Sequence, residues 1–297
     1  MTRQFFDTLR QIVQSDSVGP IRGFGRHFRW QMKKMLHQFP CELPIGESSR
    51  LFIDHANGVA ALVNAMGSYD FNNMSLLRTL LRRFGGVFVD VGANIGSYTL
   101  IASEDSSCRV VSIEPHPRSL ALLRENVRRN HRPNVLCVGV ALSDAEGWCS
   151  FTDEAELSIN RIDSPGGSGN VLRVRIRTFR SVCDELALIP DFVKIDVEGH
   201  ETRVLDGFGE LASISKVMWI EGGERASIRQ RMHENGYLGP YYSHYGAHHL
   251  SPVPRKRKED PVYVLRDFIP SLAAIGFEIR PVRQSTEAPR EPATAGT

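Results

Sequence analysis

The feature that most constrains the fold is an alternation of short apolar runs with helical patterns between residues 74 and 266. Short runs that look buried on both faces are typical of strands in a parallel sheet, and they occur at Val87–Val91, Arg109–Ile113, 134–138, Phe192–Ile195 and 216–220. Patterns typical of helices occur at residues 74–83, 97–103, 117–130, 201–208 and 225–235. This alternation predicts an α/β fold with a doubly wound, mostly parallel sheet, which binds its ligands at the carboxyl ends of the strands.

The same patterns divide the chain into three parts. We expect a helical N-terminal extension over residues 1–70 that packs on a main domain over residues 71–283, followed by a disordered tail over 284–297. Between the third and fourth strands, residues 148–152 and 171–178 alternate with period two, which predicts an inserted hairpin at about 148–178. Residues 237–243 and 261–266 are two possible closing strands.

The N-terminal extension contains a basic and aromatic stretch. Apolar residues recur at helical spacing over residues 5–13, and residues 22–34 then mix Arg and Lys with Phe24, Phe28 and Trp30. Such a composition suits an anionic membrane surface or a phosphate-bearing partner. The alternative is a helix whose aromatic side chains pack on the main domain while its basic side chains face water. We favour the alternative, because glycines interrupt any continuous apolar face.

Composition excludes several classes of protein. The net charge of +2 gives no reason to expect a nucleic-acid partner. The five cysteines form an odd set without a C-x-x-C pair, which fits a reducing compartment better than a disulfide framework or a zinc site. The N-terminus lacks a long apolar segment, and no run of about 18 apolar residues occurs. We therefore expect a soluble, cytoplasmic protein.

The turn after the first strand of the main domain constrains the ligand. A dinucleotide-binding turn reads G-x-G-x-x-G, but counting from Gly92 this chain has Asn94 and Ser97 at the second and third glycine positions. A nicotinamide-dependent oxidoreductase is therefore disfavoured. An acid near the strand end, Asp90, followed by Gly92 and Gly96, suits a ligand with a cation near the turn and no phosphates. S-adenosylmethionine is such a ligand.

Two later strand ends complete this pattern. Glu114 follows the next strand about twenty residues on, where an acid accepts both hydroxyls of a ribose. Ser143 and Asp144 follow the third strand, where a side chain can meet the exocyclic amine of adenine. Each feature has a structural alternative: the glycines could serve a tight turn, Glu114 could cap a helix, and Asp144 could form an Asx-turn. Their order at successive strand ends favours the cofactor.

The segments D-V-G-A-N-I-G-S-Y-T, I-E-P, A-L-S-D and F-V-K-I-D-V-E-G-H-E resemble the FkbM family of S-adenosylmethionine-dependent methyltransferases, over about residues 67–243. The resemblance implies a class I methyltransferase fold, with a seven-stranded sheet whose last strand is antiparallel, and methylation of an oxygen on sugars, polyketides or other small metabolites. It also implies that the cofactor pocket is lined by Asp90, Gly92, Asn94, Gly96, Glu114 and Asp144. Two positions depart from the family: residues 178–180 read T-F-R where T-L-D is common, and residues 69–70 read Y-D where a tyrosine–glutamate pair is frequent.

The fourth strand end carries the candidate catalytic residues Asp196, Glu198 and His200. Methyl transfer from a sulfonium needs a positioned acceptor and an excluded solvent, and an alcohol acceptor must also lose its proton. His200 has an unperturbed pKa of about 6.5, which suits a base, although it could instead make a backbone hydrogen bond at the helix start. In the simplest interpretation, the Glu201 carboxylate interacts favourably with the positive N-terminal end of the following helix. Glu221 could face the same cleft as Asp196, or it could hold the glycine turn that follows it.

The sequence therefore predicts an S-adenosylmethionine-dependent O-methyltransferase acting on a small-molecule or carbohydrate hydroxyl. We predict no metal ion, because the D-x-E-x-H spacing matches no closed ligand set. The rival hypotheses are the nicotinamide-dependent oxidoreductase and a non-catalytic S-adenosylmethionine-binding module acting through the basic N-terminal segment. The intact acidic cluster argues against the module. The histidine-rich loop at 244–249 could grip an anionic substrate, but a solvated loop is commoner.

Overall fold

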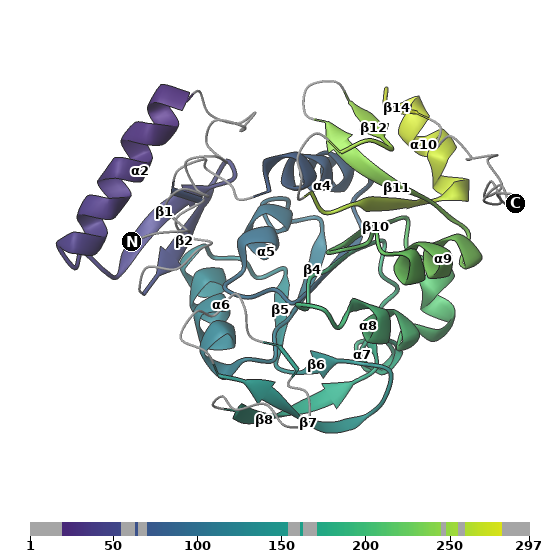
Figure 1. The fold of residues 1–297 in the computed structure, drawn as a ribbon, viewed down its shortest axis with the longest axis horizontal. Coiled ribbons are helices and arrows are strands. Elements are labelled where there is room, and N and C mark those ends of the chain that lie inside the picture. The colour runs from purple at the N-terminus through teal and green to yellow at the C-terminus, as the bar shows by residue number, and fades with distance from the viewer. Residues whose placement is uncertain are drawn as a thin grey trace, which may run out of the picture.

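The computed structural model describes residues 20–54, 63–64, 70–153, 161–162, 171–244, 248–254 and 259–280. Figure 1 shows helices on both sides of a central sheet. The helix expected within residues 5–13, the glycine-rich linker at 164–170 and the tail at 284–297 lie outside the described residues.

The central sheet has nine strands in the order β14-β12-β11-β13-β10-β9-β3-β4-β5. The strands from β5 to β10 run parallel, and β13 lies antiparallel between β10 and β11. The predicted α/β fold class, with its antiparallel last strand, is therefore confirmed, and β12 and β14 make the sheet two strands wider than the resemblance implied. The strands are β3 Val87–Val91, β4 Arg109–Ile113, β5 Val135–Val138, β9 Phe192–Ile195, β10 Val217–Ile220, β11 Tyr237–His244, β12 His249–Ser251, β13 Val262–Leu265 and β14 Glu278–Ile279.

Helices cover both faces of the sheet, which explains the continuous apolar runs. Phe88 of β3 belongs to a hydrophobic cluster with residues of α4 and α5, whereas its neighbour Val89 belongs to a cluster with residues of α7, α8 and α9. Because successive strand residues point to opposite faces, both sets must be apolar. The helices are α4 Phe71–Phe84, α5 Ser97–Ala102, α6 Pro117–Arg129, α7 Phe179–Glu185, α8 Glu201–Asp206, α9 Ala226–Glu234 and α10 Ile269–Ala274, with 3-10 turns η2 Gly209–Ser213 and η3 Arg266–Phe268.

The sequence analysis expected a helical N-terminal segment. The structure shows that this segment also contains strands. Strands β1 (Cys41–Ile45) and β2 (Ser49–Ile53) form an antiparallel hairpin that buries alternate apolar residues. The unpaired edge of β2 is hydrogen-bonded by side chains in and just after α6. The backbone N–H of Arg50 donates to the side-chain oxygen of Asn130 at 2.8 Å, and that of Phe52 donates to the side-chain oxygen of Asn126 at 2.6 Å. The hairpin is thus tied to the main domain.

Helix α2 (Pro20–Met35) precedes this hairpin and runs continuously through both of its glycines. Trp30 is buried and meets the Phe39 ring edge-on at 5.4 Å between centroids. Phe24 and Phe28 are instead exposed, so of these three aromatic residues only Trp30 is buried, in a hydrophobic cluster with residues of α4 and α5. Among the helices of the described ranges, none combines the length and apolar character that crossing a bilayer requires.

The insertion after the third main strand contains β7 (Gly147–Thr152) and β8 (Val171–Arg177), which pair antiparallel. The short strand β6 (Ala141–Leu142) adds parallel to β8 and completes a separate three-stranded sheet. Phe151 of β7 turns inward and is buried. The insertion therefore forms one wall of the cavity described next.

Candidate active site

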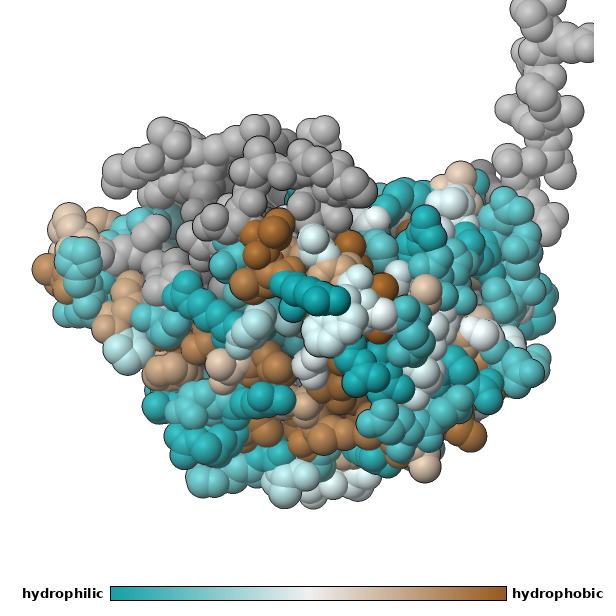
Figure 2. Space-filling view, turned by 90° about the horizontal axis from the view of Figure 1, so that it is seen from below, coloured by the Kyte–Doolittle hydropathy of each residue, from teal (hydrophilic) through white to brown (hydrophobic). Residues whose placement is uncertain are grey.

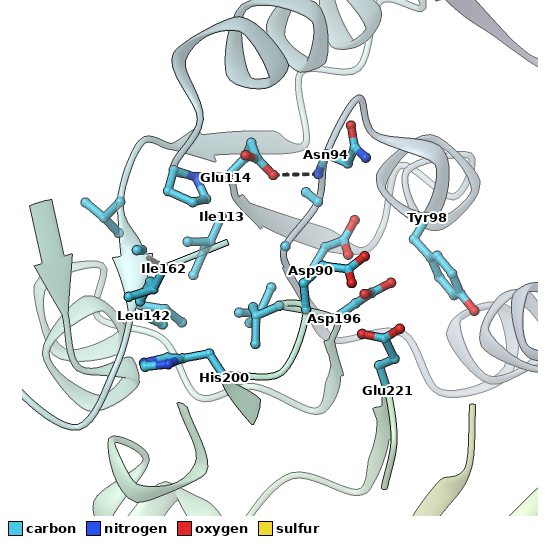
Figure 3. Close-up of a pocket in the computed structure, with 18 of the residues that line it drawn as sticks. Asp90, Asn94, Tyr98, Ile113, Glu114, Leu142, Ile162, Asp196, His200 and Glu221 are labelled. Carbon is cyan, nitrogen blue, oxygen red and sulfur yellow. Dashed lines mark hydrogen bonds between the residues drawn. The ribbon is translucent and has the colours of Figure 1, made fainter. Parts of the chain in front are cut away.

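A cavity of about 210 Å³ lies at the carboxyl ends of the parallel strands. Each of four neighbouring strands contributes an acidic residue to its lining, at or just beyond the strand end: Asp90 from β3, Glu114 from β4, Asp196 from β9 and Glu221 from β10 (Figure 3). Phe151 and Ile162 of the insertion line the opposite wall. The cavity is thus acidic on the side of the sheet and apolar on the side of the insertion.

The loop between β3 and α5 has an unusual backbone. Gly92, Asn94 and Gly96 all have left-handed conformations, with φ of +80°, +50° and +95°. Asparagine tolerates this region better than most residues. Asn94 can therefore adopt a left-handed conformation at the position where a dinucleotide-binding turn has its second glycine. A Cβ on Gly92 would lie 1.8 Å from the carbonyl oxygen of Asp196. The loop therefore passes close to the end of β9, which requires glycine.

Glu114 is held rigidly at the cavity wall. Its two carboxylate oxygens accept hydrogen bonds from the backbone N–H groups of Asn94 and His116, both at 2.8 Å, and Figure 3 shows the bond from Asn94. Burial raises the pKa of Glu114 to about 7 in spite of these two bonds. A carboxylate has about four acceptor positions, so Glu114 retains capacity for a ligand that donates hydrogen bonds.

Two further polar groups lie beside the glycine loop. Asp90 is buried and accepts a hydrogen bond from the Thr99 hydroxyl at 2.7 Å, and burial raises its pKa. The Ser97 hydroxyl is buried, lines the cavity and has no hydrogen-bond partner among the described residues. A buried hydroxyl without a partner is costly, so a polar ligand group is expected here.

Asp196, Glu198 and Glu221 form an acidic group, with one carboxylate oxygen from each lying within 4.8 Å of the others. Lys194 donates from Nζ to Asp196 at 2.5 Å. Burial and then the charge of Asp196 raise the pKa of Glu221 to about 9, and the same two causes raise the pKa of Glu198. This rise favours the protonated form of Glu221 at neutral pH. In the described part of the chain these three carboxylates could also hold a hard divalent cation.

Glu198 has a second unusual property. Its φ of +53° lies in the left-handed region, and Gly199 follows with φ of +99°. A glutamate is uncommon in this conformation, and such outliers cluster at functional sites. The turn places Glu198 on the cavity lining, which favours a chemical role for its carboxylate.

His200 lies apart from the acidic group. It sits beside Leu142, on the opposite side of the cavity from Asp196 and Glu221 (Figure 3). Its Nε2 atom is 3.0 Å from the Ser143 hydroxyl, and burial lowers its pKa. His200 and the acidic group therefore serve different ends of the cavity.

Three predicted cofactor residues do not line the cavity. The hydroxyl of Ser143 donates to Asp144 at 2.9 Å, and Asp144 forms an ion pair with Arg203. Gly96 begins α5, and a Cβ there would lie 2.6 Å from a methyl group of Leu123. Their roles toward a cofactor stay predictions.

Sequence reasoning missed four residues of this site. Tyr98 lines the cavity, and its hydroxyl donates to Asp70. Lys194 lies with Nζ 4.8 Å from the Tyr98 ring centroid. A signal existed for Lys194, because residues two apart on a strand share a face and Asp196 is two residues on. For Phe151 and Ile162 no local signal exists, since their place depends on how the insertion packs.

Comparison with known proteins now places the chain. The family model described as Methyltransferase FkbM domain matches residues 90–238, half of the chain. The chain belongs to the FkbM methyltransferase family. The matched range includes every residue that lines the cavity. The fold and the cavity are thus those of a methyltransferase family member.

A curated relative is the hexuronic acid methyltransferase AglP of Haloferax volcanii, 32% identical over 121 residues. The match covers 41% of this chain and 49% of that protein, so the chain spans about half the length of this relative. Among solved structures, the METTL16 MTase domain has a TM-score of 0.41 at 12% identity, with 65% of each chain covered. The O-methyltransferase from Bacillus cereus in complex with SAH has a TM-score of 0.38 at 12% identity, covering 65% of this chain and 80% of that one.

Proposed function

We propose that the protein is an S-adenosylmethionine-dependent O-methyltransferase that methylates a hydroxyl of a carbohydrate or other small metabolite. The observation that carries this proposal is the opening of Glu114 and Asp196 onto one cavity, at the ends of the parallel strands β4 and β9, which flank β3. Family membership supports methyl transfer, and the hexuronic acid methyltransferase among the relatives supports a carbohydrate acceptor.

The residues present fit this cofactor. The remaining lone pairs of Glu114 would accept the ribose hydroxyls, and the unpartnered Ser97 hydroxyl would bind a polar group near the glycine loop. Asp90 would offset the positive charge of the ammonium group. Buried carboxyls with raised pKa values become more favourable beside a cation, since an opposite charge stabilises their ionised form.

S-adenosylmethionine supplies a methyl group that its own sulfonium charge has already activated. The protein positions the acceptor hydroxyl beside the acidic group and takes up its proton. Glu198 is suited to this role, because its raised pKa makes it a stronger base than an exposed glutamate. Glu221 in its protonated form would donate a hydrogen bond to the acceptor, and Lys194 fixes the direction of Asp196.

Thermal unfolding with added ligands tests the cofactor. A ligand at 100 times its dissociation constant adds about 2.7 kcal/mol to stability, which raises the unfolding midpoint by several degrees. We expect a shift with S-adenosylmethionine and S-adenosylhomocysteine and none with NAD. A shift with NAD alone would support the oxidoreductase, and no shift with either methyltransferase ligand would refute the proposal.

Turnover with a labelled methyl donor tests the catalytic group. We expect Asp196→Asn to abolish transfer to a panel of carbohydrate acceptors while keeping the thermal shift with the cofactor. Asp206→Asn is the matched control, because Asp206 forms an ion pair with Arg231 on the surface and does not line the cavity. Full activity in Asp196→Asn would remove this residue from the catalytic group.

A further inference from the structure

Helix α2 has an exposed apolar stripe that the methyltransferase site does not use. Ile21, Phe24, Phe28 and Met35 are spaced by three, four and seven residues, so they share one face of the helix. Their exposed fractions are 89%, 39%, 67% and 67%. A neighbouring face of the helix is buried through His27 and Trp30. The helix is thus attached by one face and presents the stripe to solvent.

The same helix concentrates positive charge. Its sequence PIRGFGRHFRWQMKKM has five Arg and Lys residues and no acid, whereas the whole chain has a net charge of +2. Arg26 and Arg29 are exposed; Arg29 lies beside the apolar stripe, whereas Arg26 lies on the far side of the helix. At the left edge of Figure 2, over one end of α2, brown apolar and teal hydrophilic side chains lie next to each other on the surface.

We propose that α2 is a docking helix for an anionic lipid surface. The apolar stripe would enter the boundary between headgroups and acyl chains, while Arg29 beside it would pair with anionic headgroups. An interfacial helix needs both features, because apolar burial and electrostatic attraction add to each other. The objection raised by the glycines does not hold, since the helix continues through Gly23 and Gly25.

Charge decides between this surface and a second copy of the chain. A symmetric dimer through the stripe would bring two helices without acidic residues together, and their like charges would repel. A nucleic acid would pair with the arginines but would leave the aliphatic side chains of Ile21 and Met35 without an apolar environment. A lipid surface is complementary to both the charge and the apolar stripe.

Sedimentation of the full chain with lipid vesicles tests the proposal. We expect binding to vesicles of phosphatidylcholine and phosphatidylserine, weak binding to phosphatidylcholine alone, and a loss of binding as salt is raised. Phe24→Ser with Phe28→Ser should lower the partition coefficient at least about tenfold. Arg29→Gln should lower it roughly fivefold, and Arg26→Gln, on the far side of the helix, should lower it less.

Ile189→Ser is the matched control, because Ile189 is 63% exposed between α7 and β9, far from α2 in sequence. It should bind vesicles as the wild type does. The proposal is overturned if the wild type ignores anionic vesicles, if the Phe24 and Phe28 double variant binds as tightly as the wild type, or if that variant instead breaks a concentration-dependent dimer. All variants should keep the thermal shift with S-adenosylmethionine, which separates this proposal from that on function.

Discussion

Replacing Lys194 by methionine tests the electrostatic account of the site. Lys194 is 2% exposed within β9 and donates to Asp196 at 2.5 Å. Burial raises the pKa values of Asp70, Asp90 and Asp260, and the charge of Lys194 opposes the rise in all three. Methionine keeps the length and apolar volume of the side chain but removes the charge. Several buried carboxylates then lose their nearby cation.

The expected loss is large and depends on pH. Removing one partner of a buried ion pair costs about 3–5 kcal/mol, because the remaining charge is left without compensation. Without Lys194 the carboxyl pKa values in the folded state rise further above their unfolded values. The folded state then holds protons that the unfolded state releases, so stability falls as pH rises. The loss should be greatest near pH 8 and should shrink as pH falls through about 4, because the carboxyls then become protonated in the unfolded state as well.

Urea unfolding at pH 5 and pH 8 measures the effect. Lys216→Met is the matched control: Lys216 donates to Asp191 at 2.6 Å, but its side chain is 36% exposed, so removing this pair should cost less than about 1 kcal/mol. Adding Asp196→Asn to Lys194→Met should restore part of the loss. The reasoning is refuted if Lys194→Met loses no more stability at pH 8 than Lys216→Met, or loses the same amount at both pH values.

Three further predictions follow. Glu221 has a pKa raised from 4.5 to about 9, so its contribution to stability is full below about pH 4.5 and is lost as pH rises through about 9. Glu221→Gln should therefore flatten the decline of the thermal unfolding midpoint between pH 5 and pH 9. Parallel curves for the variant and the wild type would contradict this. Gly92→Ala should destabilise the fold more than Gly85→Ala in urea, because both glycines have positive φ but only at Gly92 does the new Cβ meet an atom within 4 Å, the Asp196 carbonyl oxygen; equal losses would argue against the close approach. Methyl transfer should survive EDTA treatment, as the sequence predicts no metal, and a loss restored by Mg²⁺ would instead assign the acidic group as a cation site.

Much of the fold could be predicted because it is recorded locally. A strand covered by helices on both faces is apolar at most positions, so β3, β4 and β9 could be located to the residue. The hairpin β1–β2 could not be predicted in this way. Its edge is stabilised by Asn126 and Asn130, which follow Phe52 and Arg50 by 74 and 80 residues, and nothing in residues 41–53 specifies these partners.

The candidate site likewise has features that the local sequence determines and features that depend on distant parts of the chain. Sequence alone determined that Asp90, Glu114 and Asp196 come at the ends of parallel strands, and the sheet topology then brings such residues together. Only the tertiary structure decided that Glu221 joins Asp196 and that His200 faces Ser143 instead. Local patterns record burial and backbone conformation, whereas the direction of a side chain beyond a strand end, and the pKa it acquires there, depend on neighbours from distant parts of the chain.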